Sequence, residues 1–211
     1  MRGWVLDCYP DMDADRMVLW FKTPRGPVRV VDDMTPRIYV HATKERLQKL
    51  TNDLAMIGVK DAEPQKRKVS LGEKEKDVLA VPVREYASLQ SLAMTIDSWG
   101  RYREHALFNV DLRMDQRYFL GKGLFAMGLT EIDGLKSVDA WKRIDYPVPE
   151  LKGLDLGVAV NGSGIPTMDD GLASISANDI VLDGSEERML EDLMSLVRDE
   201  DPDIIYTDRG D

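Results

Sequence analysis

The sequence has one cysteine, Cys8, and two histidines, His41 and His105, among its 211 residues. A lone cysteine excludes an intramolecular disulfide and a cysteine metal cluster, and two histidines argue against a zinc site. Long apolar runs are also missing, since no stretch approaches the roughly 20 residues that a membrane span needs. Met1 and Arg2 lead into no signal-peptide core. These absences predict a cytoplasmic protein with no membrane partner.

What is present is an uneven distribution of charge. The net charge is −10, and residues 151–211 carry 15 acidic and 4 basic side chains, so that the first 150 residues are close to neutral. Such asymmetry favours two domains with different partners, and an acidic, solvated face on the second part is the alternative interpretation. Phosphate binding, if present, belongs to the first half.

The first half predicts an α+β domain. Apolar runs at residues 4–9 and 17–22, separated by a polar turn, indicate a β-hairpin, and a Pro/Gly turn leads to a third strand. Further strands and helices complete the order strands, helix, strands, helix, strand. The expected elements are strands at 28–31, 35–41, 59–70 and 78–83 and helices at 43–56 and 88–99.

The second half predicts an α/β unit. Residues 129–149 have mixed polarity and end in two prolines, which is typical of a domain connection, and strands are expected at 154–160 and 171–176. Ser185 can cap a helix whose apolar face starts at Met189, and Pro202 ends it. Ile204–Tyr206 then reads as a short buried strand. Ligand sites in such folds lie beyond strand ends.

The C-terminal stretch SEERML…LVRDEDPDIIYTDRGD resembles the helix–strand segment of the 3′–5′ exonuclease domain in archaeal family B DNA polymerases. The family's Tyr-Asn-Gly-Asp motif has its counterpart here in Asp208-Arg209-Gly210-Asp211. TPRIYVHA and HALFNVDLRMDQRYFLGKGL are similar to two segments of the family's N-terminal domain. The resemblance implies the front of a longer chain, with a template-facing domain at 1–130, a connection at 131–150, and the start of a ribonuclease H-like exonuclease domain at 151–211, truncated at Asp211.

The resemblance also implies contact with template DNA. Members of this family use an N-terminal pocket to detect uracil in the template, and Pro36 and Arg117 fall at pocket positions, with Tyr9 or Pro10 near the first-strand position. Arg37 stands where the family has tyrosine, and Arg113 and Met114 stand where it has Pro-Phe. Phosphate contacts are expected from cationic side chains, and an ion pair is the alternative role for Arg117. The expected DNA-binding residues are Pro36, Arg37, Arg113, Arg117 and Lys122.

The resemblance further implies a degenerate nuclease site. Active relatives begin this domain with Asp-Ile-Glu and hold two metal ions on such carboxylates, whereas this chain reads Asp155-Leu156-Gly157. Asp211 is kept in the second motif, but Arg209 brings a positive charge there. We therefore expect no metal and no catalysis in this segment, with Mg²⁺ belonging to the parent polymerase if it is active. A rescue by Asp169 and Asp170 is the alternative.

These observations predict a template-binding part of a family B polymerase-like protein that acts in DNA replication or repair, although polymerase motifs are not among these residues. Its expected partners are template DNA, the remainder of the polymerase chain and replication proteins. The alternative is a structural or protein-interaction module without DNA contact. Convergence of the basic residues on one face would favour DNA; these are Lys60, Lys66, Arg67, Lys68, Arg113, Arg117 and Lys122.

Overall fold

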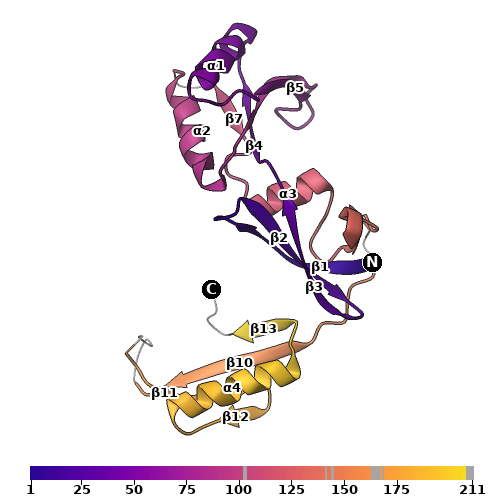
Figure 1. The fold of residues 1–211 in the computed structure, drawn as a ribbon, viewed down its shortest axis with the longest axis vertical. Coiled ribbons are helices and arrows are strands. Elements are labelled where there is room, and N and C mark those ends of the chain that lie inside the picture. The colour runs from indigo at the N-terminus through magenta and orange to yellow at the C-terminus, as the bar shows by residue number, and fades with distance from the viewer. Residues whose placement is uncertain (102–103, 141, 144, 163–166, 168, 208–211) are drawn as a thin grey trace. The chain divides into compact units, whose positions relative to one another are not determined.

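The computed structural model describes residues 1–101, 104–140, 142–143, 145–162, 167 and 169–207. The chain divides into two compact units, Met1–Val148 and Pro149–Asp211 (Figure 1). None of the helices among the described residues is long and apolar enough to cross a membrane. Mixed sheets with few helices confirm the α+β expectation for the first unit.

Sheet 1 of the first unit has the strand order β3-β2-β1-β8-β9. The predicted hairpin forms, with Tyr9 opposite Val18 and Cys8 opposite Leu19. Its apolar side chains pack with Tyr86 and Tyr118 into one core. The strands are β1 (Arg2–Asp11), β2 (Arg16–Thr23), β3 (Gly26–Asp33), β8 (Leu129–Glu131) and β9 (Lys136–Ser137).

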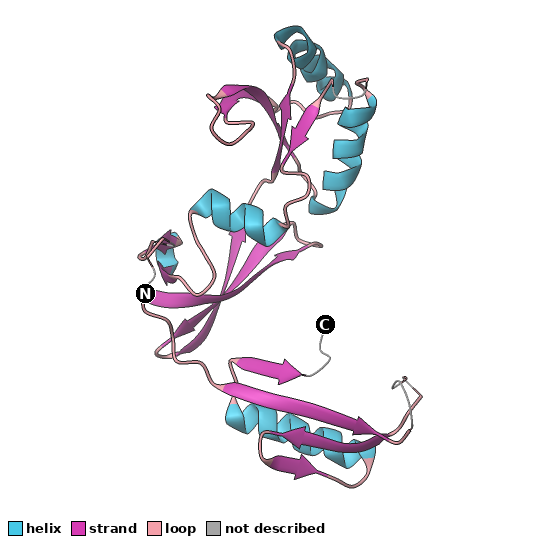
Figure 2. Ribbon diagram, turned by 180° about the vertical axis from the view of Figure 1, so that it is seen from behind, coloured by secondary structure: helices cyan, strands magenta, loops and turns pink. Residues whose placement is uncertain are grey.

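Sheet 2, also in the first unit, has the order β5-β6-β4-β7. Its helices α1 and α2 lie on the same side of the strands (Figure 2), where Ile38 and Val40 join Leu50, Leu54 and Ile96 in a second core. The opposite side of this sheet faces away from α1 and α2. The elements are β4 (Arg37–His41), α1 (Lys44–Met56), β5 (Glu63–Arg67), β6 (Lys76–Pro82), η1 (Tyr86–Ser88), α2 (Leu89–Ser98) and β7 (Ala106–Phe108).

Two features of the first unit differ from the sequence-based expectation. A helix, α3 (Met114–Lys122), forms where none was predicted. The sequence pattern did not indicate it, because its buried residues Arg117 and Tyr118 are adjacent rather than spaced at helical intervals. Residues 129–137, expected in the domain connection, instead supply β8, the 3₁₀ turn η2 (Ile132–Gly134) and β9 to sheet 1. The pairing of β8 with β1 explains this, since backbone hydrogen bonds do not require apolar side chains.

The second unit contains sheet 3, with the order β12-β11-β10-β13, and one long helix. Leu154 and Ile175 are buried on the face that the helix covers, where Met189 is also fully buried. Ser185 caps the helix as predicted, by accepting a hydrogen bond from the Arg188 backbone N–H. The elements are β10 (Gly153–Val160), β11 (Leu172–Ala177), β12 (Ile180–Leu182), α4 (Glu186–Glu200) and β13 (Ile204–Thr207).

The predicted C-terminal strand forms as β13, but the prediction that it is buried was wrong. Ile205 is 45% exposed and Tyr206 is 54% exposed in β13. The reason is position: β13 is an edge strand that pairs only with β10, in parallel, and α4 covers one face of the sheet. The apolar face of α4 is likewise narrower than its sequence predicts, since Met194 is 54% exposed.

Two methionines on α4 test this arrangement. We expect Met189→Ala to lower the free energy of unfolding of the second unit by about 2–5 kcal/mol, because it leaves a cavity in a fully packed site. The matched change Met194→Ala is expected to stay within about 0.5 kcal/mol, because that side chain is exposed. Hydrogen exchange of the β10 and β11 amides measures both, and equal losses of protection would contradict the assigned helix face.

Candidate nucleic-acid interface

Alternation along β4 gives sheet 2 its two different faces. Ile38 and Val40 are buried against the helices, so Arg37 and Tyr39 point to the opposite face. Phe108 on β7 pairs directly with Tyr39 and therefore lies on that same face. The side of sheet 2 opposite α1 and α2 thus presents a cation and two aromatic rings.

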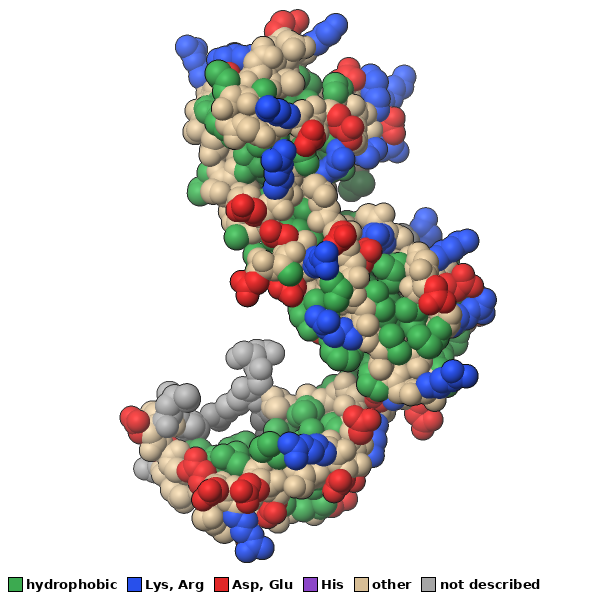
Figure 3. All heavy atoms as spheres, viewed as in Figure 1, with side chains coloured by type: hydrophobic (Ala, Val, Ile, Leu, Met, Phe, Trp, Pro, Cys, Tyr) green, Lys and Arg blue, Asp and Glu red, His purple; other side chains and the backbone are tan. Residues whose placement is uncertain are grey.

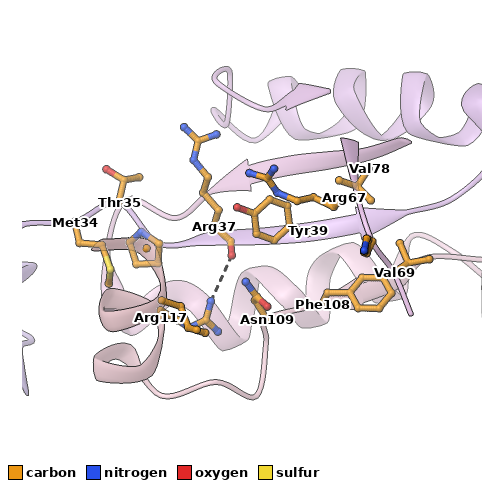
Figure 4. A pocket seen from close by; sticks show the side chains of 14 residues that line it. Met34, Thr35, Arg37, Tyr39, Arg67, Val69, Val78, Phe108, Asn109 and Arg117 are labelled. Carbon is orange, nitrogen blue, oxygen red and sulfur yellow. Dashed lines mark hydrogen bonds between the residues drawn. The ribbon is translucent and has the colours of Figure 1, made fainter. Parts of the chain in front are cut away.

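A pocket of about 550 Å³ lies on this face of sheet 2 (Figure 4). Sheet 2 forms its floor, α3 forms one wall, and the segments before β4 and after β5 border it. We call it the β4–α3 pocket, and no aspartate or glutamate lines it. The lining residues are Met34, Thr35, Pro36, Arg37, Tyr39, Arg67, Lys68, Val69, Val78, Phe108, Asn109, Arg117, Leu120 and Gly121.

Arg117 is the buried cation of this pocket, with a side chain only 8% exposed. Its Nε donates to the carbonyl oxygen of Leu112 at 2.8 Å, and Nη1 donates to that of Arg37 at 3.4 Å. Nη2 is buried and has no hydrogen-bond partner in the described part of the chain. Burial lowers the pKa of Arg117, and the negative charge of Asp111 partly offsets that effect. The guanidinium remains charged, because arginine keeps its proton inside proteins.

The other cations lie at the rim of the pocket. The Arg67 guanidinium stands over the Tyr39 ring, 5.6 Å from its centroid. Arg37 forms an ion pair with Glu63, which lies outside the lining. Arg67 and Lys68 have no carboxylate partner among the described residues. Positive charge is therefore concentrated here without full compensation.

The structure brings together three of the five predicted DNA-binding residues. Pro36, Arg37 and Arg117 all line the β4–α3 pocket. Arg113 does not line it, and its guanidinium forms an ion pair with Asp115 at 2.8 Å. Lys122 is also outside the lining.

Lys122 is held on sheet 1 by an ion pair of 2.6 Å with Asp32. Tyr9, named as a first-strand candidate, is 41% exposed on β1, and neither it nor Pro10 lines the pocket. Sequence reasoning missed Tyr39, Phe108 and Asn109 as pocket residues. Alternation along β4 was an available signal for Tyr39, but the pairing with β7 brings in Phe108.

The seven basic residues do not converge as a single set. Arg67, Lys68 and Arg117 line the pocket, whereas Lys66 points to the other face of β5 and forms an ion pair with Asp77 at 2.7 Å. Lys60 lies outside the lining. The acidic side chains, by contrast, predominate on the second unit in the face that Figure 3 shows.

The strand expected to carry the first nuclease motif is β10, which includes Asp155 and Gly157. Side chains alternate between the two faces of a strand, and Leu154 is buried under α4. Asp155 and Gly157 therefore lie on the face of sheet 3 opposite α4. A β-carbon on Gly157 would come 2.5 Å from Ser176 Oγ, its cross-strand partner. No group of three metal-ligating side chains occurs among the residues that the structure describes. Arg209 and Asp211 lie outside those residues.

The aspartate pair named as a rescue lies in the loop between β10 and β11. Asp170 accepts hydrogen bonds from the Thr167 backbone N–H at 2.8 Å and from its hydroxyl at 3.0 Å. These bonds are typical of a side chain that closes a turn.

Comparisons with known proteins give one type of match. No protein-family model matches the sequence, and no curated protein matches it. Among solved structures, the chain is similar to the family B DNA polymerase from the hyperthermophilic archaeon Pyrobaculum calidifontis, with a TM-score of 0.76 and 19% sequence identity. The match covers 98% of this chain and 30% of that chain. The likeness shows the fold, and this chain spans under a third of the polymerase's length.

Tyr118 anchors the α3 wall of the pocket through a buried hydrogen bond to Asp32. Its hydroxyl donates to Asp32 Oδ2 at 2.7 Å, and the ring is fully buried. Burial and then this bond raise the pKa of Tyr118, so the hydroxyl stays a donor. Burial alone would raise the pKa of Asp32, but hydrogen bonds from Lys122 and Tyr118 outweigh it and lower the pKa.

We expect Tyr118→Phe to lower the free energy of unfolding by about 1.5–3 kcal/mol, because it removes a buried bond to a charged acceptor. Because the folded-state pKa of Asp32 is lowered, its contribution is present above the unfolded-state pKa and is lost as the pH falls through the folded-state value. The effect of Tyr118→Phe should therefore shrink in acid. Urea denaturation at several pH values measures this, with the exposed Tyr9→Phe as control; a pH-independent difference would contradict it.

Proposed function

We propose that this chain contributes template DNA binding to a family B DNA polymerase-like protein in DNA replication or repair. The observation that carries the proposal is the β4–α3 pocket, whose lining includes Pro36 and the cations Arg37, Arg67, Lys68 and Arg117 and no acidic residue. Cationic side chains supply most of the affinity for a phosphate backbone, and aromatic or guanidinium planes let bases stack. Similarity to an archaeal family B DNA polymerase over 98% of the chain supports the same role.

The interface extends, in this proposal, beyond the pocket to Arg113 and Lys122. Each already neutralises a carboxylate, Asp115 and Asp32 respectively, so each contributes less than an uncompensated cation. Arg37 lines the pocket but also forms an ion pair with Glu63, so its charge is partly neutralised. The remainder of the polymerase chain and replication proteins are the further proposed partners.

DNA binding is tested by fluorescence anisotropy of single-stranded and primer-template DNA at several salt concentrations. We expect affinity to fall steeply with salt, and Arg37→Gln to reduce the slope of log K against log salt by up to about 0.7 for single strands. Arg113→Gln and Lys122→Gln should give smaller reductions. Lys49→Gln, an exposed change on α1 away from the pocket, is the matched control.

Absence of binding at low salt would reject the DNA role. It would favour the second candidate, a structural or protein-interaction module, for which the acidic second unit with exposed Val181 and Met194 offers a surface. A template with uracil in place of thymine, measured beside the first, tests whether the pocket discriminates the two bases.

We further propose that the second unit is the first part of a ribonuclease H-like 3′–5′ exonuclease domain without nuclease activity. Asp155 is present, but Gly157 stands where the resemblance places a glutamate. Asp170 accepts hydrogen bonds from Thr167 within its own turn. Arg209, at the second motif, would repel cations. One carboxylate on β10 gives two metal ions too few ligands.

The protein incubated with 5′-labelled single-stranded DNA and Mg²⁺ or Mn²⁺ is expected to leave the strand at full length. Asp155→Ala is the control, because it removes the remaining carboxylate of the first motif. Shortening of the 3′ end that disappears in Asp155→Ala would show that the nuclease site works and would reject the proposal.

A further inference from the structure

The β4–α3 pocket is charged unlike the chain as a whole. The protein carries a net charge of −10, yet this pocket is lined by four cations and no acidic residue. Arg37 has Glu63 as a partner, whereas Arg67, Lys68 and Arg117 have no ion-pair partner among the described residues. A concave surface with one sign of charge concentrates its field and favours a ligand of opposite charge.

Burial of Arg117 strengthens that preference. A buried cation without an ion pair is unfavourable, and the charge of Asp111 offsets this only in part. The buried Nη2 donor also has no acceptor among the described residues. The two carbonyl oxygens that Arg117 does contact supply dipoles but no countercharge. An anion seated in the pocket would supply it.

The pocket has more volume than an inorganic anion would fill, and planar side chains form part of its surface. Its volume is about 550 Å³, within the range of sites for small organic ligands. Arg67 stacked over Tyr39 forms a planar platform, and Phe108 lies beside Tyr39 on the next strand. Asn109, held with a positive φ of 63°, brings an amide to the lining. Such planes stack nucleobases, and such amides hydrogen-bond their edges.

We propose that the β4–α3 pocket binds a nucleoside 5′-monophosphate group, carried either by a free nucleotide or by the 5′-phosphorylated end of a strand. A phosphomonoester carries about −1.5 to −2 charge at neutral pH, which matches the uncompensated cations better than the single charge of a backbone diester. The base occupies the platform of Arg67 and Tyr39. When a strand carries the group, the inference rests on the proposed DNA-binding function.

The test compares 3′-labelled 12-nucleotide strands that differ only in a 5′-phosphate or a 5′-hydroxyl, using anisotropy with the whole protein. We expect the phosphorylated strand to bind at least about tenfold more tightly. Deoxyadenosine monophosphate should displace it at lower concentration than deoxyadenosine or inorganic phosphate does. Displacement by the free nucleotide identifies a nucleotide site, and its absence with the strand preference intact identifies a strand-end site.

Exposed rim cations provide the variants, because their replacement leaves both cores intact. Arg67→Gln and Lys68→Gln should each reduce the preference for the 5′-phosphate by at least about threefold. Lys49→Gln, an exposed lysine on α1, should preserve it. A preference that survives in the Arg67→Gln/Lys68→Gln double variant would place the phosphate elsewhere and overturn the proposal.

The outcomes separate this proposal from the function above. Equal, salt-sensitive binding of both strands would reject the monophosphate site and leave DNA binding standing. Binding of deoxyadenosine monophosphate without binding of either strand would support the site and reject the DNA role. Binding of neither ligand at low salt would reject both.

Discussion

The guanidinium of Arg117 is the interaction on which the pocket depends. Its Nη1 donates to the carbonyl of Arg37 at the start of β4 and its Nε to the carbonyl of Leu112, so α3 is fixed against the beginning of that strand. The next residue, Tyr118, faces the other way and packs in the core of sheet 1. Two adjacent side chains therefore join two sheets. Because an arginine has five donors and one positive charge, a joint built from two carbonyls leaves charge to spare, and the pocket forms around that surplus.

The contacts of Arg117 and Tyr118 also show which elements could be predicted from the sequence and which could not. Strands with alternating burial, such as β4, and helices with one apolar face, such as α1, follow from periodicity. The helix α3 does not, because its buried residues face two directions and break the helical period. Arg67 and Lys66 read alike in the sequence, and only the pairing of β5 with β6 decides which of them meets the pocket. Phe108 becomes a neighbour of Tyr39 through a strand pairing that spans about 70 positions of sequence.

In the second unit, element types were more predictable than burial. The cap at Ser185 and the stop before Pro202 are local signals, and α4 follows them closely. Burial of β13 and of Met194 depends instead on whether another element packs against them, and the local sequence pattern does not encode such tertiary contacts. Sheet 3 consequently combines a dry face under α4 with an open face that carries Asp155 and Gly157.

Gly157 and Ser176 have a consequence for the reversibility of evolutionary change. If a glutamate once stood at position 157, its reappearance by a single mutation would place a β-carbon against the Ser176 hydroxyl, which would have to rotate away. The two positions are thereby epistatic: the effect of one substitution depends on the residue across the strand pair. A side chain introduced at position 157 alone therefore requires Ser176 to adopt another rotamer, whereas the same change combined with Ser176→Ala meets only an ordinary contact with the β-carbon at 176.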